Sequence, residues 1–411
     1  MLSSQLAGET PILSMAENNT RTQVGIVGAG PAGLLLSHLL SLNGIESIVV
    51  EDKSRSYVES RIRAGVLEHG TAQLLCDSGV GERLAKEGMR HEGINLGFSG
   101  QLHRINLAEL TGGKAITVYG QHEVLKDLIA TRLSCGGQIL FEVAGVTLDG
   151  ITTNQPRICF RRHDRSYEIT CDWVAGCDGF RGVSRECIPP AALTTFEKTY
   201  PFAWLGILAE AAPSWEELIY ANHENGFALF SMRSPKITRL YLQCQPDEDL
   251  SKWSDDRIWE NLEKRLSFPG DKAIQRGAIL QKSVTTMRSF VVEPMRYGRL
   301  FLAGDAAHVV PPTGAKGMNL AVGDVWLLAQ ALAAFYANGQ IGLLESYSER
   351  CLRRVWKAQR FSWCMTSLLH RFDQNDAFEY RRQLAELDYL TTSRAAATVL
   401  AENYVGLPWT D

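Results

Sequence analysis

A glycine triplet near the N-terminus constrains the fold of this chain more than any other feature. The glycines are Gly28, Gly30 and Gly33, and they join an apolar, β-rich run at residues 23–27 to a segment with helical spacing at residues 31–42. In such a loop the first glycine permits a tight turn and the second lets the main chain approach a pyrophosphate. The third lets the helix pack closely on the strand. The unpaired N–H groups at the start of the helix then face the phosphates.

A second apolar run supports the same interpretation. Residues 48–50 are apolar and β-branched, and Glu51 follows them directly. A strand, a helix and a strand within about 30 residues form a βαβ unit, and an acid about 20 residues beyond the triplet suits the hydroxyl groups of a ribose. The pattern therefore predicts an α/β domain that binds a dinucleotide, but it does not separate NAD from FAD.

Composition bounds the class of protein. The chain has 411 residues, of which 45% are hydrophobic and 21% charged, and its formal net charge is -4. This length suggests two or three domains, and the balance of residue types excludes wholesale disorder. A mildly acidic chain is not expected to bind nucleic acid.

The residue usage also predicts a cytoplasmic protein without a membrane span. The best candidate span, residues 322–339, contains Asp324, Gln330 and Asn338, so we expect a helix of the protein core instead. The N-terminus lacks early basic residues and a clean apolar stretch, which argues against a secretory signal. Nine cysteines are scattered without a Cys-x-x-Cys pair, as in proteins with reduced thiols, and we expect no metal site.

The pattern divides the chain into four segments. Residues 1–21 are polar and aperiodic and predict a flexible tail, and residues 22–199 predict the dinucleotide-binding domain. Residues 200–290 alternate short aromatic and aliphatic runs with turn residues, which predicts an antiparallel sheet with paired strands within residues 227–245. Residues 291–411 begin with a strand and continue with helical spacing, and they predict a return to the first domain followed by a helical C-terminal region.

Two later segments place an aspartate beside a glycine at the end of a strand. Asp178 follows the apolar run at residues 173–175, and Asp305 follows the run at residues 300–303. Main chain and carboxylate can approach a ligand closely at such a point. The stretch 311–319 then begins with two prolines and continues with glycines, which predicts a rigid and then permissive loop that enters a helix. A plain NAD-dependent dehydrogenase does not need both segments.

These three segments, in this order, resemble the class A flavoprotein monooxygenases. Longer stretches extend the resemblance to family members that act on 4-hydroxybenzoate, and the match runs over about residues 22–408. Those stretches are Arg61–Glu68, Val118–Gln121, Ser289–Met295 and Ala401–Pro408. The resemblance implies an α/β fold with a Rossmann-like FAD-binding domain, an antiparallel β-sheet substrate domain and a helical C-terminal region.

The resemblance also implies an activity. It is the ortho-hydroxylation of 4-hydroxybenzoate to 3,4-dihydroxybenzoate by an FAD-dependent monooxygenase, through a flavin C4a-hydroperoxide, with NADH and/or NADPH and O2 consumed. A homodimer is implied as well. Two alternatives stay open. One is a hydroxylase of a related aromatic acid such as 4-aminobenzoate, and the other is a flavin-binding redox sensor without turnover, which would show no substrate-stimulated oxidation of NAD(P)H.

Several positions match the family's contacts with FAD. The resemblance implies that Asp305 holds the ribityl chain, that Arg63 holds the pyrophosphate, and that Gln121 contacts the diphosphate or ribityl part. Lys316 would place positive charge near the reduced flavin, and Arg239 would bias the flavin between its inner and outer positions. The expected cofactor contacts are Gly28, Gly30, Gly33, Glu51, Arg61, Arg63, Gln121, Asp178, Arg239, Asp305, Lys316, Gly317, Met318 and Asn319.

The expected carboxylate clamp comes from the second domain. Ser231 and Arg233 are two residues apart on a predicted strand, so both face one side, and Tyr241 lies on the neighbouring strand. The resemblance implies that these three residues hold the carboxylate of the aromatic acid. The planar fork of an arginine suits that task because it pairs with a carboxylate through two hydrogen bonds.

At the other end of the ring, the resemblance implies a proton relay. Tyr220 would contact the phenolic oxygen, Tyr404 would contact Tyr220, and His91 would end the relay to solvent. The carbonyl of Pro312 would help to orient the ring. Such a relay is needed because a buried phenol resists ionisation unless its charge is stabilised.

The expected contacts with the nicotinamide cofactor depart from the family pattern. Asp52 stands where NADPH-using members have Arg, and Arg181 replaces a His of those members. A carboxylate at this place repels a 2′-phosphate, although Lys53 partly offsets its charge. Tyr57 and Arg288 are retained. We therefore expect a weakened preference for NADPH, with NADH accepted.

Overall fold

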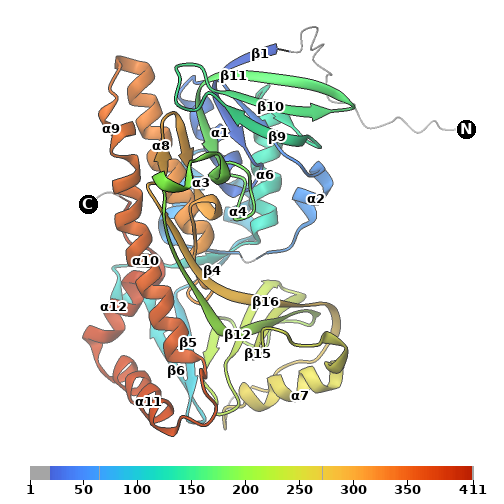
Figure 1. Cartoon of the computed structure of the whole chain (residues 1–411). Coiled ribbons are helices and arrows are strands. Elements are labelled where there is room, and N and C mark those ends of the chain that lie inside the picture. Colours follow the sequence, from blue (N-terminus) through green and yellow to red (C-terminus); the bar gives the residue numbers. More distant parts are fainter. Residues whose placement is uncertain (1–18, 64, 271, 410–411) are drawn as a thin grey trace, which may run out of the picture.

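The structure, a computed structural model, describes residues 19–63, 65–270 and 272–409. Most of the flexible tail predicted for residues 1–21 lies outside the described residues. The described chain contains two large sheets joined by long C-terminal helices (Figure 1). The first sheet consists of β1 (Asn19–Val27), β2 (Ser47–Val50), β8 (Gln138–Leu140), β9 (Ala144–Asp149), β10 (Arg157–Arg162), β11 (Arg165–Gly176), β17 (Arg296–Tyr297) and β18 (Leu300–Leu302).

The centre of the first sheet is parallel, as the βαβ pattern predicts. Its strands lie in the order β18, β11, β1, β2 and β8, and each neighbouring pair runs in parallel. The carboxyl ends of these strands therefore meet at one edge. Gly28 follows β1, Glu51 follows β2, Asp178 follows β11, and Asp305 follows β18. The sheet thus brings together four positions that are spread over most of the chain.

The first strand is longer than the sequence pattern predicted. β1 begins at Asn19 rather than near residue 23, and residues 19–22 pair with residues 168–171 of β11. Main-chain pairing with β11 decides this start, because a ladder of hydrogen bonds does not require apolar side chains. Residues 19–21 therefore belong to the strand and not to the predicted tail.

Helices α1 (Pro31–Leu42), α6 (Gln121–Ser134), α8 (Gly317–Asn338) and α10 (Tyr347–Leu369) accompany this sheet. α1 packs against α6 and α8, and α8 packs against α10. α8 is long and apolar enough to cross a membrane by length and composition alone, yet most of its apolar stretch is buried inside the protein. This agrees with the core helix that we expect from the acid and amides within it.

The second sheet is antiparallel apart from one parallel pair, β13 and β5. The predicted strand pair is present as β14 and β15, which a tight turn joins at Ser234 and Ile237. Two of its strands come from residues 93–106, before the segment 200–290. Its strands, in spatial order, are β19 (His308–Val309), β16 (Ala278–Glu293), β12 (Thr194–Glu210), β15 (Ile237–Cys244), β14 (Ala228–Ser234), β13 (Ile219–Ala221), β5 (Gly93–Phe98) and β6 (Gln101–Asn106).

The remaining elements include a small sheet and shorter helices. The small sheet has β3 (Val66–Leu67), β7 (Ile116–Val118) and β4 (Met89–His91). The other α-helices are α2 (Arg55–Ser60), α3 (His69–Asp77), α4 (Glu82–Glu87), α5 (Leu107–Leu110), α7 (Asp255–Arg265), α9 (Gly342–Glu345), α11 (Ala377–Thr392) and α12 (Arg394–Val405). Short 3₁₀ turns occur at η1 (Arg185–Cys187), η2 (Pro190–Ala192), η3 (Leu250–Lys252) and η4 (Gly304–Ala306).

The C-terminal helices cover part of the second sheet. Phe361 and Leu368 of α10, Leu387 of α11 and Leu400 of α12 share one apolar cluster with Trp204 and other residues of that sheet. In Figure 1, α10 runs alongside both sheets, with α11 and α12 beside the second one. This packing brings the end of the chain to the same place as the middle of the second sheet.

Candidate active site

The glycine-rich loop has the geometry that a pyrophosphate requires. A Cβ at Gly33 would stand 2.0 Å from the carbonyl oxygen of Gly28, and Gly28 itself has a positive φ of 102°. A Cβ at Gly30, in contrast, would meet no protein atom within 4 Å. No side chain caps the start of α1, so no capping side chain occupies the N–H groups of its first turn. Two glycines therefore serve the packing of the loop, and Gly30 leaves room for a ligand.

Alanine substitutions at two of these glycines are expected to have different effects. Gly33→Ala forces the loop apart and should destabilise the apoprotein by about 1–3 kcal/mol, the usual cost of overpacking. Gly30→Ala should leave the apoprotein within about 1 kcal/mol of the original chain, because Ala is only a poorer helix cap than Gly. It should nevertheless weaken FAD binding at least about tenfold, which corresponds to about 1.4 kcal/mol. Urea unfolding and FAD titration measure both, and unchanged FAD affinity in Gly30→Ala would contradict this role.

Charged side chains from distant segments meet beside the loop. Asp305 is exposed at the carboxyl edge of the first sheet, although Gly304 and Ala306 on either side are buried. Surrounding protein raises the pKa of the Asp305 carboxyl, and the nearby charges of Arg63 and Arg61 oppose that rise. Two arginines and one acid thus converge from positions that lie far apart in the chain. Cations suit a pyrophosphate, and a carboxylate suits sugar hydroxyl groups.

The other predicted dinucleotide contacts lie at the same edge. Glu51 accepts a hydrogen bond from the Ala29 N–H at 2.7 Å and one from the Lys53 N–H at 2.9 Å. Burial and the neighbouring Asp52 raise the pKa of Glu51. Gln121 is the first residue of α6. The loop geometry, the open place at Gly30 and these side chains together fit FAD.

Asp178 has a partner within the protein. One of its carboxylate oxygens accepts the Ser184 N–H at 2.8 Å, and a Cβ on Gly182 would collide with it. The other carboxylate oxygen, Oδ1, is buried and lacks a partner among the described residues. Asp178 therefore holds the loop after β11 and keeps one oxygen for a further donor.

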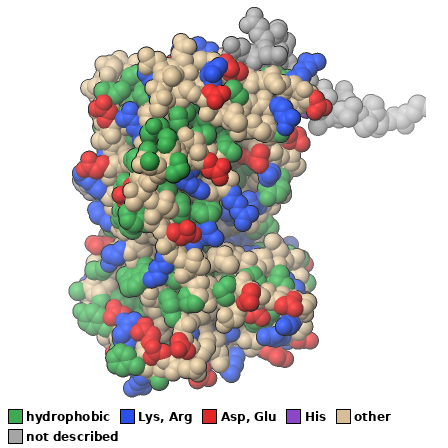
Figure 2. All heavy atoms as spheres, viewed as in Figure 1, with side chains coloured by type: hydrophobic (Ala, Val, Ile, Leu, Met, Phe, Trp, Pro, Cys, Tyr) green, Lys and Arg blue, Asp and Glu red, His purple; other side chains and the backbone are tan. Residues whose placement is uncertain are grey.

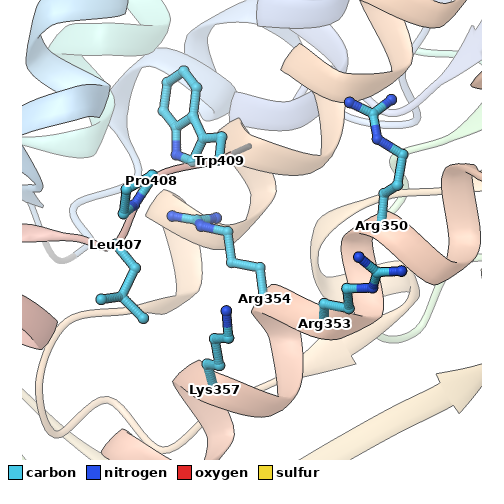
Figure 3. Close-up of a pocket in the computed structure, with 7 residues that line it drawn as sticks. All are labelled: Arg350, Arg353, Arg354, Lys357, Leu407, Pro408 and Trp409. Carbon is cyan, nitrogen blue, oxygen red and sulfur yellow. The ribbon is translucent and has the colours of Figure 1, made fainter. Parts of the chain in front are cut away.

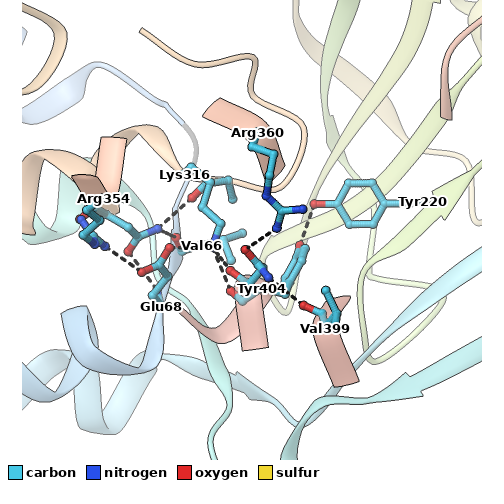
Figure 4. A network of polar contacts seen from close by, with 11 residues as sticks. Val66, Glu68, Tyr220, Lys316, Arg354, Arg360, Val399 and Tyr404 are labelled. Carbon is cyan, nitrogen blue, oxygen red and sulfur yellow. Dashed lines mark hydrogen bonds and ion pairs between the residues drawn. The ribbon is translucent and has the colours of Figure 1, made fainter. Parts of the chain in front are cut away.

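The loop that precedes α8 is fixed by a buried polar network (Figure 4). The Lys316 ammonium donates a hydrogen bond to Glu68 at 2.6 Å and also to the main-chain carbonyls of Asn403 and Tyr404. Burial lowers the pKa of Lys316, and Glu68 opposes that shift. Arg354 of α10 donates to the other oxygen of Glu68. The Lys316 charge is thus largely paired, and its expected role beside the flavin remains a prediction.

Asn319 is likewise engaged in the network. Its side chain accepts the Glu68 N–H at 2.9 Å and donates to the carbonyls of Val66 and Ala315. It therefore ties β3 to the first turn of α8. Gly317 and Met318 occupy that same turn and are only half-buried, and the start of α8 has no side-chain cap. These features leave its N–H groups available to an anionic ligand.

Two arginines with incomplete hydrogen bonding meet on one face of the second sheet. Arg233 donates to Ser231 Oγ at 2.8 Å, and its Nε is buried without a partner among the described residues. One terminal nitrogen of Arg239 is likewise buried without a partner among the described residues. The Arg239 guanidinium carbon lies 5.0 Å from the centroid of the Tyr241 ring. Burial alone would raise the pKa of Tyr241, but the two guanidinium groups hold it below its usual value. Such unpartnered cationic donors are what a carboxylate ligand satisfies.

Strand register explains why these residues meet. Ser231 lies opposite Arg239, and Tyr241 lies opposite Gly206 of β12. A Cβ on Gly206 would stand 2.7 Å from the Arg239 side chain and 3.2 Å from the Tyr241 ring, so only glycine leaves room for both. Arg233 stands where the β14–β15 register shifts, and this bulge, rather than simple alternation along the strand, aims its side chain.

The two tyrosines that the resemblance assigns to the phenolic end of the substrate are in direct contact. The hydroxyl groups of Tyr220 and Tyr404 lie 2.6 Å apart, and both side chains are buried (Figure 4). Burial raises the pKa of Tyr220 to about 12, whereas hydrogen bonds with Tyr404 and with the main chain of Gly314 oppose the rise. Burial raises the pKa of Tyr404 well above its usual value. Both phenols are therefore neutral near pH 7 and able to pass protons.

Tyr220 lies within two strands of the arginine cluster, by which we mean Ser231, Arg233, Arg239 and Tyr241. Register joins Tyr220 of β13 to Leu229 of β14, and Leu229 to Tyr241 of β15. Neighbouring strands are about 4.8 Å apart, so two spacings give roughly 10 Å. One aromatic ring with an acid at one end and a hydroxyl group at the other spans a distance of this order.

Two further residues predicted for the phenolic end of the substrate are His91 and Pro312. His91 is buried on β4, and neither of its ring nitrogens has a partner among the described residues. Burial lowers the pKa of His91 to about 4, so the ring is neutral near pH 7. The Pro312 carbonyl accepts the Ala315 N–H at 3.0 Å, which leaves one lone pair for a ligand. No contact shown here joins His91 to Tyr404.

The residues expected for the nicotinamide cofactor occupy two places. Asp52 and Lys53 are exposed and form an ion pair at 2.7 Å beside the start of α2, where Tyr57 is also exposed. Arg288 of β16 lies over the ring of Phe180, next to Arg181 in the chain, and pairs with Glu197 at 3.6 Å. Arg181 is exposed. The structure thus joins Arg288 to the loop of Arg181.

A hollow of about 320 Å³ lies apart from these groups (Figure 3). None of the predicted site residues is in its lining, and it meets the network at Arg354, which also donates to Glu68. Its lining is basic on one side and apolar on the other. The lining residues are Arg350, Arg353, Arg354, Lys357, Leu407, Pro408 and Trp409.

Two residues with evident roles were not identified from the sequence. Glu68 lies in the Arg61–Glu68 stretch that carries part of the resemblance, but nothing in the pattern marks it as the buried partner of Lys316 and Arg354. Gly206 carries no signal either, because its role arises from two side chains on the neighbouring strand. Only contacts between distant segments identify them.

Comparison with known proteins gives consistent matches. A family model described as an FAD binding domain matches residues 21–362. The chain is 49% identical to the p-hydroxybenzoate hydroxylase of Acinetobacter baylyi, over 95% of this chain and 96% of that protein. It is 28% identical to 3-(3-hydroxy-phenyl)propionate/3-hydroxycinnamic acid hydroxylase 2 of Burkholderia vietnamiensis, over 82% of this chain and 61% of that protein.

Solved structures show the same fold at lower identity. The p-nitrophenol 4-monooxygenase of Pseudomonas putida superimposes with a TM-score of 0.80 at 20% identity, over 94% of this chain and 98% of that chain. Aklavinone-11 hydroxylase, solved with FAD and aklavinone, gives a TM-score of 0.71 at 22% identity, over 85% of this chain and 69% of that chain. At such identities the likeness concerns the fold alone.

Proposed function

The chain belongs to the FAD-binding-domain family and, within it, to the p-hydroxybenzoate hydroxylases, and from this premise we propose how its residues act. It is an FAD-dependent aromatic monooxygenase that converts 4-hydroxybenzoate into 3,4-dihydroxybenzoate. One observation carries the proposed pose. Arginine donors without a partner among the described residues lie on the same sheet as Tyr220, within two strands of it, and Tyr220 bonds Tyr404 of α12.

We propose that the arginine cluster anchors the acid. Arg233 provides the main positive charge, and Ser231 and Tyr241 complete the set of donors. Arg239, which we expect to act on the flavin, adds positive charge beside them. Because Arg233 Nε and one terminal nitrogen of Arg239 are buried, a charged hydrogen bond to either contributes more than it would in solution. The substrate ring then points its hydroxyl group toward Tyr220.

The tyrosine pair is proposed to remove the phenolic proton. When FAD is bound, reduced by a nicotinamide and exposed to O2, it supplies the electrophilic oxygen atom. A phenolate is more electron-rich at the neighbouring carbon than a phenol is, so deprotonation promotes the transfer. Tyr220 accepts the proton while passing its own to Tyr404, and the neutral imidazole of His91 is the proposed terminal acceptor.

The test is oxidation of NADH and of NADPH by the purified protein, with and without 4-hydroxybenzoate, while 3,4-dihydroxybenzoate and hydrogen peroxide are quantified. We expect strong stimulation by the substrate, with product matching the cofactor consumed. Stimulation that yields mostly peroxide would point instead to a related acid such as 4-aminobenzoate as the true substrate. The absence of stimulation with either cofactor would favour a redox sensor.

Asp52 is proposed to set the nicotinamide preference. Its exposed carboxylate, paired with Lys53, repels a 2′-phosphate, so NADH should be accepted readily. Asp52→Arg replaces that repulsion with attraction and frees Lys53. It should raise kcat/KM for NADPH relative to NADH by about tenfold or more, since exposed charges at contact distance contribute about 1 kcal/mol each.

A matched charge reversal controls for net charge. Asp77 is exposed on α3, a helix that carries none of these residues, so Asp77→Arg should leave the cofactor ratio unchanged. The proposal fails if the original chain already strongly prefers NADPH or if Asp52→Arg does not move the ratio.

We further propose a homodimer located in the cytoplasm. Large apolar side chains are exposed on the C-terminal helices, and Figure 2 shows hydrophobic groups over that part of the surface. They include Trp356 and Trp363 on α10 and Phe378 on α11. Exposed patches of this kind often mark an interface. Sedimentation equilibrium tests the proposal, and a mass equal to the single chain of 45.6 kDa would refute it.

A further inference from the structure

A buried acid behind the first sheet contacts both sides of the turn that carries Asp305. Asp324 of α8 and His308 of β19 are 2% and 1% exposed. Oδ2 of Asp324 accepts the Gly304 N–H at 2.9 Å and lies 2.6 Å from His308 Nε2. Gly304 directly precedes Asp305, and His308 follows three residues later. One carboxylate oxygen of Asp324 therefore contacts the residues at both ends of this turn.

The rest of the turn is held just as closely. Gly304 adopts a positive φ of 62°, and a Cβ on it would stand 3.1 Å from Cβ of Ala321, so α8 lies directly against it. On the strand that leads into the turn, the Leu302 carbonyl accepts a hydrogen bond from Tyr347 of α10 at 2.8 Å. Asp305 is the one residue of this turn, among the described ones, whose side chain is exposed at the sheet edge.

We propose that Asp324 is a positioning residue for FAD. By binding the Gly304 N–H and His308 Nε2, it holds the Asp305 carboxylate toward the cofactor. The inference rests on the proposed contact between Asp305 and FAD and goes beyond it. Without Asp324, the Gly304 N–H and His308 Nε2 would both lose the partner that they have in this buried turn. The turn would then relax, and Asp305 would no longer be held in one orientation.

A double-mutant cycle tests this proposal. FAD dissociation constants are measured on apoprotein of Asp305→Ala, Asp324→Ala and the double variant. Each single change should weaken FAD about 10- to 100-fold, the range for hydrogen bonds that involve charged groups. If Asp324 acts through Asp305, the double variant should be within about threefold of Asp305→Ala, because coupled residues do not add.

A matched control separates positioning from general loss of stability. His38 of α1 is also a buried histidine, and its Nε2 is bonded to the Ser78 carbonyl at 2.8 Å, away from Asp305. His38→Ala should change FAD affinity little, and its effect should add to that of Asp305→Ala. Binding of 4-hydroxybenzoate to each FAD-saturated variant should remain close to that of the original chain.

The outcomes are distinct. The role of Asp324 would be overturned if the losses of FAD affinity in the two single variants multiply in the double variant. Full FAD affinity in Asp324→Ala would overturn it as well. Full affinity in Asp305→Ala would refute the proposed contact of Asp305 itself and the positioning role with it. If Asp324→Ala does not fold, the cycle is run with Asp324→Asn, which keeps the shape but loses the charge. It should weaken FAD about 3- to 10-fold, again without adding to Asp305→Ala.

Discussion

Arg233→Ala is expected to raise the dissociation constant for 4-hydroxybenzoate about 30- to 4,000-fold, since removal of one partner of a buried, hydrogen-bonded charge pair costs about 2–5 kcal/mol. Its Nε lacks a partner among the residues that the structure describes, and a carboxylate is a group that can satisfy it. Arg233→Lys keeps the charge but loses the fork and should recover only part of the affinity. Titration of the FAD-loaded protein with substrate measures all three constants.

Arg104→Ala provides the matched control. Arg104 lies on the same sheet in β6 and forms an exposed ion pair with Glu217 at 2.7 Å. An exposed pair contributes about 0–1 kcal/mol to stability, and its loss should leave substrate binding unchanged. An Arg233→Ala protein that binds 4-hydroxybenzoate within twofold of the original chain would refute the clamp.

Tyr220→Phe is expected to abolish most hydroxylation while leaving substrate binding largely intact. The ring and its packing remain, but the hydroxyl group that bonds Tyr404 at 2.6 Å is lost. Loss of a positioned acid–base group costs typically about 10²–10⁴-fold in rate. We expect the product formed per nicotinamide oxidised to fall, with hydrogen peroxide formed instead, because the ring is less reactive without deprotonation.

The comparison variant is Tyr200→Phe. Tyr200 lies in β12 of the same sheet, and its hydroxyl group is 3.2 Å from Ser289 Oγ, so this change also removes one phenolic hydroxyl group. It should leave the ratio of product to nicotinamide unchanged. Product yields from Tyr220→Phe that equal those of Tyr200→Phe would rule out the relay. Quantified product and peroxide from single reactions decide the matter.

Parts of the site could be read from the sequence because they depend on local chemistry. The loop geometry requires Gly28 and Gly33 to be small, whereas Gly30 leaves an open place, and the acids at the strand ends meet at one edge of the sheet as the pattern predicted. The strand pair around residues 227–245 was also predictable from alternation and turn residues. The start of β1 was not, since main-chain pairing with β11 extends it to Asn19.

The sequence by itself determined the α/β class, the order of the segments and the kinds of side chain offered to a dinucleotide and an aromatic acid. Periodicity and turn chemistry act over a few residues, so one chain is enough to reveal them. Only the tertiary structure decided which groups meet. Tyr404 reaches Tyr220 because α10–α12 pack on the second sheet, and Glu68 neutralises Lys316 across 248 positions.

The same holds for the two positions that carry the clearest structural constraints. Gly206 is required by side chains on a neighbouring strand, and Asp324 is defined by a turn that lies before it in the chain. Such roles arise from burial, where an unpaired polar group costs free energy and a spare methyl group has no space. Burial depends on the complete tertiary structure, and for that reason no local pattern in the sequence predicts these two roles.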